Sequence, residues 1–438
     1  MLLMFVILFH LCCCFFMWRI GRGYSAFTLF LLAMIVYPTL WAIQVTGNYS
    51  VITVVQEHLL VLAEFLVAFC FTLGVMLHFM TLKLYGRQAY LTGNFELIYP
   101  GKFSVFMVLI ISIASFMVYL NELRQHQMNL LAIMIERGIE SSLNISFYPR
   151  WMSGWFEQVG ILLFAYKCAS GKKYSYTFVA ALIILTTAWL IIQGGRKALL
   201  DYFLYLWLIW GVTSGNGSST VMSFFRIHFD VFTKKRAYVS ILSILLATIF
   251  IAALTYARTA GDDGSGAERG FEMLVNGSYG GLDTTGFILT NKSGQSDVML
   301  SVFDWIWAPI PRSMWPDKPL MLGGRIVEEM GFDLQTYGAP TVNFYGELFR
   351  MGGLLALMVG ITIMGMFTSY IETRIKSEKR LYSVLMFLAI YVFGINNLWI
   401  LSFSDAVNFI IMFSIPLVMI RFLSKKKYNM EHCTEPAL

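Results

Sequence analysis

Long apolar stretches recur along the whole chain and set the strongest limit on its fold. About eleven of them approach the roughly 20 residues that an α-helix needs to cross a bilayer. They lie near residues 1 to 18, 24 to 45, 58 to 80, 103 to 121, 151 to 168, 177 to 193, 199 to 213, 238 to 257, 341 to 370, 381 to 402 and 405 to 423. Hydrophobic residues make up 58% of the chain and charged residues 13%, and the mean hydropathy is +0.67. This balance excludes an ordinary soluble domain and predicts an all-α, polytopic bundle of membrane helices.

The lysines and arginines between these predicted spans are divided unequally between the two faces of the membrane. One face is expected to carry Arg19, Arg22, Lys83, Arg87, Lys172, Lys173, Lys234, Lys235, Arg236, Arg374, Lys376, Lys379, Arg380, Lys425, Lys426 and Lys427. By the positive-inside rule this face is cytoplasmic, which places the C-terminus inside and the N-terminus outside. The same basic collar accounts for the formal net charge of +6 and favours anionic lipid head groups, so no nucleic-acid partner is expected.

A long polar segment, residues 258–340, interrupts the predicted spans on the external face. Residues 1–438 are expected to form a single membrane domain, with this segment as its one large external loop. A structured loop of roughly 80 residues exceeds what a connection needs, so the chemistry is expected here. Its acidic residues outnumber its basic residues, which is compatible with a local anion site but not with a general polyanion-binding surface. The cysteines show no spacing typical of a metal site, and none is expected.

Ala308–Pro319, A-P-I-P-R-S-M-W-P-D-K-P, is the most informative stretch of this loop. Its four prolines fix the backbone and remove donors, so the stretch predicts a structured turn near the membrane surface and not a regular spanning helix. Arg312 and Lys318 in this turn, with Arg325 after it, form a cation cluster that can bind phosphate oxygens. Two other interpretations stay open: an interfacial connector with snorkelling cations, or a network of ion pairs. The acids available for such a network are Asp317, Glu328 and Glu329.

Two further polar elements are expected on the same face. The sequence Q-G-G-R-K places Arg196 directly after two glycines at the external edge of a span, where it either approaches a lipid-linked phosphate or snorkels. At the start of the ninth predicted span, Glu347 and Arg350 share a helix face. They either pair with each other, or Glu347 acts as a base at the external mouth of the bundle. Glu64, inside the third predicted span, is the remaining intramembrane acid and is expected to make a satisfied polar contact.

Three of these stretches resemble sequences of the Wzy-type polysaccharide polymerases, the integral membrane glycosyltransferases that polymerise O-antigen or related lipid-linked repeat units. They are G-G-R at Gly194–Arg196, I-P-R-S-M-W-P-D-K-P at Ile310–Pro319 and Y-G-E-L-F-R-M-G-G at Tyr345–Gly353. The motifs cover a small part of the chain. The expected number of spans and the single large loop are similar to that family over the whole length.

The resemblance implies a multi-pass protein of the bacterial inner membrane whose large loop and active site face the periplasm. Such an enzyme transfers a glycan from undecaprenyl pyrophosphate to the non-reducing end of another lipid-linked repeat unit, without a metal or other cofactor. The implied pyrophosphate-binding residues are Arg196, Arg312, Lys318 and Arg325. Arg312 would stabilise the charge that grows on the leaving group, and Glu347 would deprotonate the acceptor hydroxyl. The implied partners are the lipid-linked oligosaccharides, membrane lipids and a chain-length regulator protein.

Two other functions compete with this interpretation. An O-antigen ligase uses the same donor but passes the glycan to a lipid A core, and ligases of that type carry a functional histidine in the large external loop. None of the six histidines of this sequence falls in residues 258–340, which favours the polymerase. A polysaccharide flippase or other transporter predicts polar residues scattered through many span interiors. The interiors here are mostly Leu, Ile, Phe and Val, which argues against transport.

Overall fold

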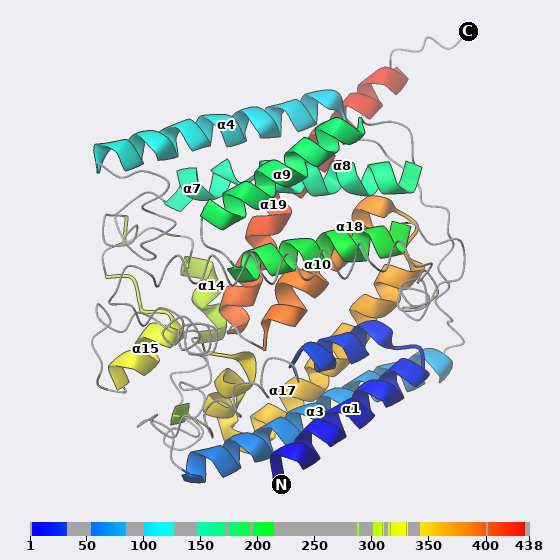
Figure 1. Ribbon diagram of the computed structural model, residues 1–438, viewed down its shortest axis with the longest axis vertical. Coiled ribbons are helices and arrows are strands. Elements are labelled where there is room, and N and C mark those ends of the chain that lie inside the picture. Colours follow the sequence, from blue (N-terminus) through cyan, green and yellow to red (C-terminus); the bar gives the residue numbers. More distant parts are fainter. Residues whose placement is uncertain are drawn as a thin grey trace, which may run out of the picture.

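A computed structural model of the protein (Figure 1) describes fourteen parts of the chain. They are residues 2–32, 54–84, 100–126, 147–170, 175–192, 196–213, 287–288, 301–308, 310, 314–315, 317–329, 331, 342–399 and 402–433. Every regular element within these ranges is a helix. The expected all-α class is therefore confirmed for the part of the chain that the structure describes.

Within the described residues, four helices are long and apolar enough to cross a membrane. They belong to α3 (Val54–Leu84), α4 (Lys102–Gln125), α17 (Phe344–Ser377) and α19 (Phe403–Cys433). Shorter helices complete the bundle, namely α1 (Leu2–Arg19), Gly23–Leu32, α8 (Phe156–Ser170), α9 (Tyr176–Ile192), α10 (Arg196–Thr213) and α18 (Leu381–Ala389). The membrane-bundle interpretation agrees with these helices. The span predicted near residues 238–257 lies outside the described residues, so the count of eleven stays a prediction.

The surface of the long helices is apolar, as expected of helices that face lipid. Leu355 on α17 is 74% exposed, Phe422 on α19 is 69% exposed and Ile113 on α4 is 63% exposed. Buried positions on the same helices hold polar residues such as Glu64, Ser112 and Thr368. A soluble protein of this kind would expose a large contiguous apolar area to water, whereas a bilayer solvates it.

The contact between α3 and α17 depends on two glycines that let the helix backbones approach closely. A Cβ atom on Gly74 would lie 2.0 Å from the carbonyl oxygen of Thr362, and one on Gly365 would lie 2.2 Å from the carbonyl oxygen of Phe71. Both distances are far below van der Waals contact, so only glycine fits at either position. Small residues at a helix interface are the usual means of close packing in membranes, where apolar burial gives little driving force.

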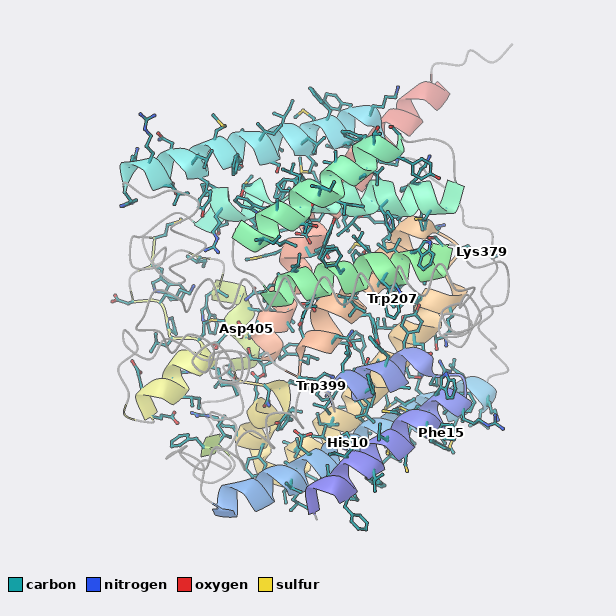
Figure 2. All side chains as sticks on the ribbon, in the orientation of Figure 1. His10, Phe15, Trp207, Lys379, Trp399 and Asp405 are labelled. Atoms are coloured by element: carbon teal, nitrogen blue, oxygen red, sulfur yellow. The ribbon has the colours of Figure 1, made fainter. Side chains whose placement is uncertain are left out.

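The helices run side by side, and the bundle therefore has two distinct ends (Figure 1). The short helices α14 (Asp304–Trp307) and α15 (Leu322–Glu329) lie together at one end, which we call the site end. Asp405, near the start of α19, lies toward this end, and Lys379, just after α17, lies at the opposite end (Figure 2). The segment from which chemistry is expected thus supplies α14 and α15 to one end of the bundle.

A buried ionic cluster joins the turn after α1 to the last turns of α17 at the end opposite the site. Lys376 donates a hydrogen bond to the Gly21 carbonyl oxygen at 2.7 Å and also pairs with Glu372. The other oxygen of Glu372 accepts from the backbone N–H and the hydroxyl of Ser25 at 3.1 and 2.8 Å. Arg22 donates to the Thr373 hydroxyl at 2.7 Å. Arg22 and Lys376, which were predicted to share one face, therefore lie at the same end of the bundle.

The span that contains α18 loses its α-helical hydrogen bonding before it reaches the site end. A π-helical turn, Ile390–Gly394, and a 3₁₀ turn, Ile395–Asn397, follow α18. The side-chain amide of Asn397 donates to the carbonyl oxygens of Val392 and Phe393 at 3.3 and 3.0 Å. These bonds give two backbone carbonyls of the irregular turn a side-chain donor inside the bundle. The Leu398 carbonyl then accepts from the N–H of Phe344 at 3.0 Å and fixes where α17 begins.

Candidate active site

A sharp break in α17 creates the framework of the candidate site. Gly352 and Gly353 have non-helical backbone angles, and Gly353 has φ +61° and ψ −150°, a conformation that is practically restricted to glycine. Residues 344–351 therefore form a short helix of their own, separate from the spanning part of α17. Asn343 caps this short helix, because its side-chain oxygen accepts from the Gly346 N–H at 3.0 Å.

The carboxylate of Glu347 lies at the point where three segments of the site end meet. The hydroxyl of Ser301, in the turn before α14, donates to its Oε1 atom at 2.8 Å. The backbone N–H of Phe403, the first residue of α19, donates to its Oε2 atom at 2.8 Å. The Glu347 side chain is fully buried. In this conformation the carboxylate holds α14, α17 and α19 together, and a substrate hydroxyl has to replace one of these donors to reach it.

A second buried carboxylate, Asp304, receives the start of α15. Its Oδ2 atom accepts from the Leu322 N–H at 3.2 Å and from the Arg325 guanidinium at 3.0 Å. Burial raises the pKa of Asp304 to about 6, and the charge of Arg325 opposes that rise. Asp304 and Asp405 each add a repulsive charge near Glu347. Three acids thus gather at the site end, from α14, α17 and α19.

Hydroxyl groups fix α14 against the start of α19. The backbone N–H of Trp305 donates to the Ser404 hydroxyl at 3.2 Å, and that hydroxyl donates to the Ser301 carbonyl oxygen at 2.6 Å. The Ser402 hydroxyl donates to the Asp405 carboxylate at 2.8 Å and accepts from the Asp405 N–H at 3.2 Å. The second pair caps the N-terminus of α19, an arrangement that the S-x-x-D sequence could have indicated.

Arg350 makes a two-pronged ion pair with Glu329 of α15. The Nη1 and Nη2 atoms of Arg350 donate to the two carboxylate oxygens of Glu329 at 2.9 and 2.6 Å. The sequence left open whether Glu347 and Arg350 pair with each other. In the structure, Arg350 forms its ion pair with Glu329, an acid of another helix. The break after Met351 and the position of α15 explain this choice, since they bring Glu329 over the short helix.

Of the four predicted cations, the structure describes the side chains of Lys318 and Arg325 but not those of Arg196 and Arg312. Lys318 donates to the carbonyl oxygens of Ala308 and Ile310 at 2.8 and 3.0 Å, so its ammonium group contacts the start of the proline-rich stretch. Arg325 is bound to Asp304, and 21% of its side chain is exposed. Arg196 is the first residue of α10, and its side chain is not among those described. Arg312 lies outside the described residues.

Several residues at the site were not singled out in the sequence. Ser301 carries no sequence signal, Asp405 has only the capping pattern that it forms with Ser402, and Asp304 is an isolated acid in an aromatic stretch. Glu64, which was expected to make a satisfied polar contact, lies fully buried with its Oε2 atom 4.0 Å from the Nε2 atom of His10, which is longer than a hydrogen bond. Among the described residues, no group of three or more His, Cys, Asp or Glu side chains could hold a metal ion.

The fold and this site define a class of protein: a helical membrane protein with charged side chains buried at one end of its bundle. The curated proteins similar to it include the O-antigen polymerases of Salmonella typhimurium strain LT2 and Salmonella typhi. Each is 23% identical to this chain over an alignment of 294 residues, and the match covers 65% of this chain. The match spans 64% of the length of these relatives, just under two thirds. No protein-family model and no solved structure matches. The likeness supports at most a distant relationship to Wzy-like polymerases.

Proposed function

We propose that this protein is a polysaccharide polymerase of the O-antigen type. It transfers a glycan from undecaprenyl pyrophosphate to the non-reducing end of another lipid-linked repeat unit, at the periplasmic face of the bacterial inner membrane. The observation that carries the proposal is the similarity to two O-antigen polymerases over 294 residues. The convergence of acids and arginines at one end of a membrane bundle supports it, because lipid-linked substrates reach a protein from the bilayer.

The cations of the site end fit the leaving group of this reaction. As the anomeric bond breaks, negative charge grows on the pyrophosphate oxygen, and guanidinium groups already in place stabilise the transition state more than the ground state. Arg325 is held close to Asp304 but remains partly exposed, so it can contact an anion at the mouth of the bundle. Arg196 at the start of α10 and Arg312 are the other arginines proposed for this role. Lys318 donates to the carbonyl oxygens of Ala308 and Ile310, in the proline-rich stretch of the sequence that also contains Arg312.

Glu347 is proposed as the base that accepts the proton of the acceptor hydroxyl. The donor that now reaches its Oε1 atom is itself a hydroxyl, that of Ser301, so a sugar hydroxyl can make the same bond in its place. The Phe403 N–H bond keeps the carboxylate oriented during this exchange. The acceptor oxygen then attacks the anomeric carbon, the bond to pyrophosphate breaks, and Glu347 retains the proton.

The partners follow from the same proposal. The protein binds lipid-linked oligosaccharides as donor and acceptor, is embedded in membrane lipids, and works with a chain-length regulator protein. No metal or other cofactor is proposed for the reaction. Activity of the purified enzyme should therefore survive treatment with a strong chelator, and a loss of activity that Mg²⁺ restores would contradict this part of the proposal.

Deletion of the gene tests the function directly. A polymerase acts after the repeat unit is made and flipped, so the deletion strain should carry lipopolysaccharide with a single repeat unit. Arg196→Ala and Arg312→Ala should reproduce that pattern. A ligase would leave core without any repeat while lipid-linked polymer accumulates, and a flippase would leave unpolymerised units on the cytoplasmic face. Long lipid-linked polymer in the deletion strain would exclude a polymerase.

A further inference from the structure

The guanidinium of Arg350 is buried at the mouth of the bundle and bound by an acid from outside the spans. Its side chain has no exposed surface, whereas the Glu329 side chain that binds it is 23% exposed. Glu329 is the last residue of α15, a helix that belongs to the large polar segment and not to a spanning helix. A charge placed this deep requires a partner with matching geometry, because desolvation penalises it otherwise.

The geometry of the pair suits an anion with two adjacent oxygens. Two parallel N–H···O bonds, at 2.9 and 2.6 Å, join the two terminal nitrogens of Arg350 to the two oxygens of Glu329. A guanidinium binds a phosphate group through the same pair of parallel bonds. The Glu329 carboxylate therefore occupies a position in which two oxygens of a phosphate group fit equally well.

The attachment of α15 explains how this position can open. The first turn of α15 is held by Asp304, which accepts bonds from Leu322 and Arg325, and Ile326 in its middle is fully buried. At its last residue, the Glu329 side chain makes two hydrogen bonds to Arg350. Replacement of Glu329 by another anion would break these two bonds while the N-terminal end of α15 stays bound.

We propose that Arg350 is a diphosphate-binding residue and that Glu329 occupies its anion site until a lipid-linked diphosphate displaces the carboxylate. The identity of the diphosphate rests on the proposed function, in which the donor carries one. Glu329 and the diphosphate then compete for one guanidinium. Part of the binding free energy of the diphosphate is spent on breaking the existing pair, so the observed affinity is lower than the intrinsic one.

Binding of undecaprenyl pyrophosphate to the purified full-length protein in nanodiscs tests this competition. Glu329→Gln removes the competing charge and should tighten binding by roughly fivefold, within the range of typical coupling between sites. Arg350→Gln should weaken binding at least about tenfold, since it removes the fork that grips the phosphate. Lys376→Gln breaks a buried ion pair at the opposite end of the bundle and should leave the affinity unchanged.

A charge exchange separates binding from structural pairing. Arg350→Glu combined with Glu329→Arg restores an ion pair, so the folded protein should persist, but the buried cation of the site is gone and binding should stay weak. Wild-type affinity in this double variant would overturn the proposal. Unchanged or weaker binding in Glu329→Gln would also overturn it. If Arg350→Gln alone does not fold, Glu329→Gln and the double variant still test whether Arg350 binds the diphosphate.

The source of the recognised anion and the proposed function are tested by the same measurements. Inorganic pyrophosphate should respond to Glu329→Gln in the same direction as the lipid-linked form, because the fork binds the phosphate oxygens. No response with either probe contradicts the Arg350 site. These assays need no acceptor and no chain growth. Normal polymer in the deletion strain would exclude the polymerase function without affecting the binding result. If the protein is a polymerase but Glu329→Gln does not change diphosphate binding, only the Arg350 site is excluded.

Discussion

Leu348 packs directly against the backbone of Gly360. A Cβ atom on Gly360 would lie 2.5 Å from a methyl carbon of Leu348. In a continuous helix these two residues would be roughly 18 Å apart along the axis. The short helix of residues 344–351 is therefore folded back on the spanning part of α17. This reversal turns Glu347 and Arg350 toward α14, α15 and α19 at the mouth of the bundle.

The reversal should depend on the conformation of Gly353. Gly353→Ala should lower the free energy of unfolding by about 1–3 kcal/mol, because φ +61° with ψ −150° is strained for any residue with a Cβ atom. Apart from its neighbours in the chain, no atom of the described residues lies within 4 Å of the place a Cβ would take, so the cost comes from the backbone itself. Thermal unfolding of the purified protein in detergent measures it. Leu354→Ala, at a neighbouring exposed position, is the matched control and should cost far less.

Asp304 should give the protein a pH-dependent stability. Its folded-state pKa of about 6 exceeds the ordinary value of 3.8, so the folded state holds the proton more tightly than the unfolded state does. The free energy of unfolding should therefore fall as pH rises from about 4 to about 6, by on the order of 3 kcal/mol, and stay level above that range. Unfolding curves at pH 4.5 and pH 7 should show this slope in the wild type.

The control for the pH dependence of stability is Asp317, an exposed acid of the same polar segment. Asp304→Asn should flatten the pH dependence between pH 4 and pH 6, whereas Asp317→Asn, at an exposed position, should leave it as it is. The bond from Arg325 to residue 304 needs the ionised carboxylate, so it should weaken in the wild type below pH 6. Equal slopes in the wild type and Asp304→Asn would show that burial does not act on this carboxyl as described.

Arg312 should tolerate no exchange for lysine if it grips pyrophosphate with two parallel bonds. Arg312→Lys keeps the charge but loses the fork, and we expect a loss of about 2–4 kcal/mol in transition-state stabilisation at normal membrane abundance. Polymer length on lipopolysaccharide measures the loss of activity, and the abundance of the protein in membranes shows whether the variant is still made and folded. Full activity in Arg312→Lys would reduce Arg312 to a general positive charge.

Cysteine labelling should establish which face of the membrane the site end occupies. In a background without the native cysteines, Asp317→Cys at the site end should react with an impermeant thiol reagent in intact spheroplasts. Ser377→Cys, at the opposite end, should react only after the membrane is opened. The reverse pattern would contradict the periplasmic placement of the site. Ser265→Cys and Ser296→Cys should follow Asp317→Cys.

Three of the long helices of the bundle were predictable from apolar length alone. The stretches predicted near residues 58–80, 103–121 and 405–423 each fall inside a single long helix, because a bilayer requires about 20 apolar residues and the sequence supplies them. The stretch predicted near 341–370 also contains a helix. Hydropathy averaged over a window does not detect the reversal of the chain after Met351. The pair Gly352 and Gly353 was the local signal for it.

The partners at the site were much less predictable. Residues three apart share a face of a regular helix, so the sequence spacing alone predicted that Glu347 and Arg350 could pair. The observed partner of Arg350, Glu329, belongs to another helix, and one donor to Glu347 is a backbone N–H that leaves no trace in a sequence. Arg325 and Lys318 were identified as cations, but their contacts with Asp304 and with backbone carbonyls required the folded chain.

The buried cluster of Glu372, Lys376 and Ser25 also has a consequence for how the protein is made. Ser25 and its acceptor are 347 positions apart in the chain. At translation rates of about 5–20 residues per second, the turn after α1 waits roughly 20–70 s for its partner in α17. This turn therefore reaches its final contacts only after most of the spans between Ser25 and Glu372 have been synthesised.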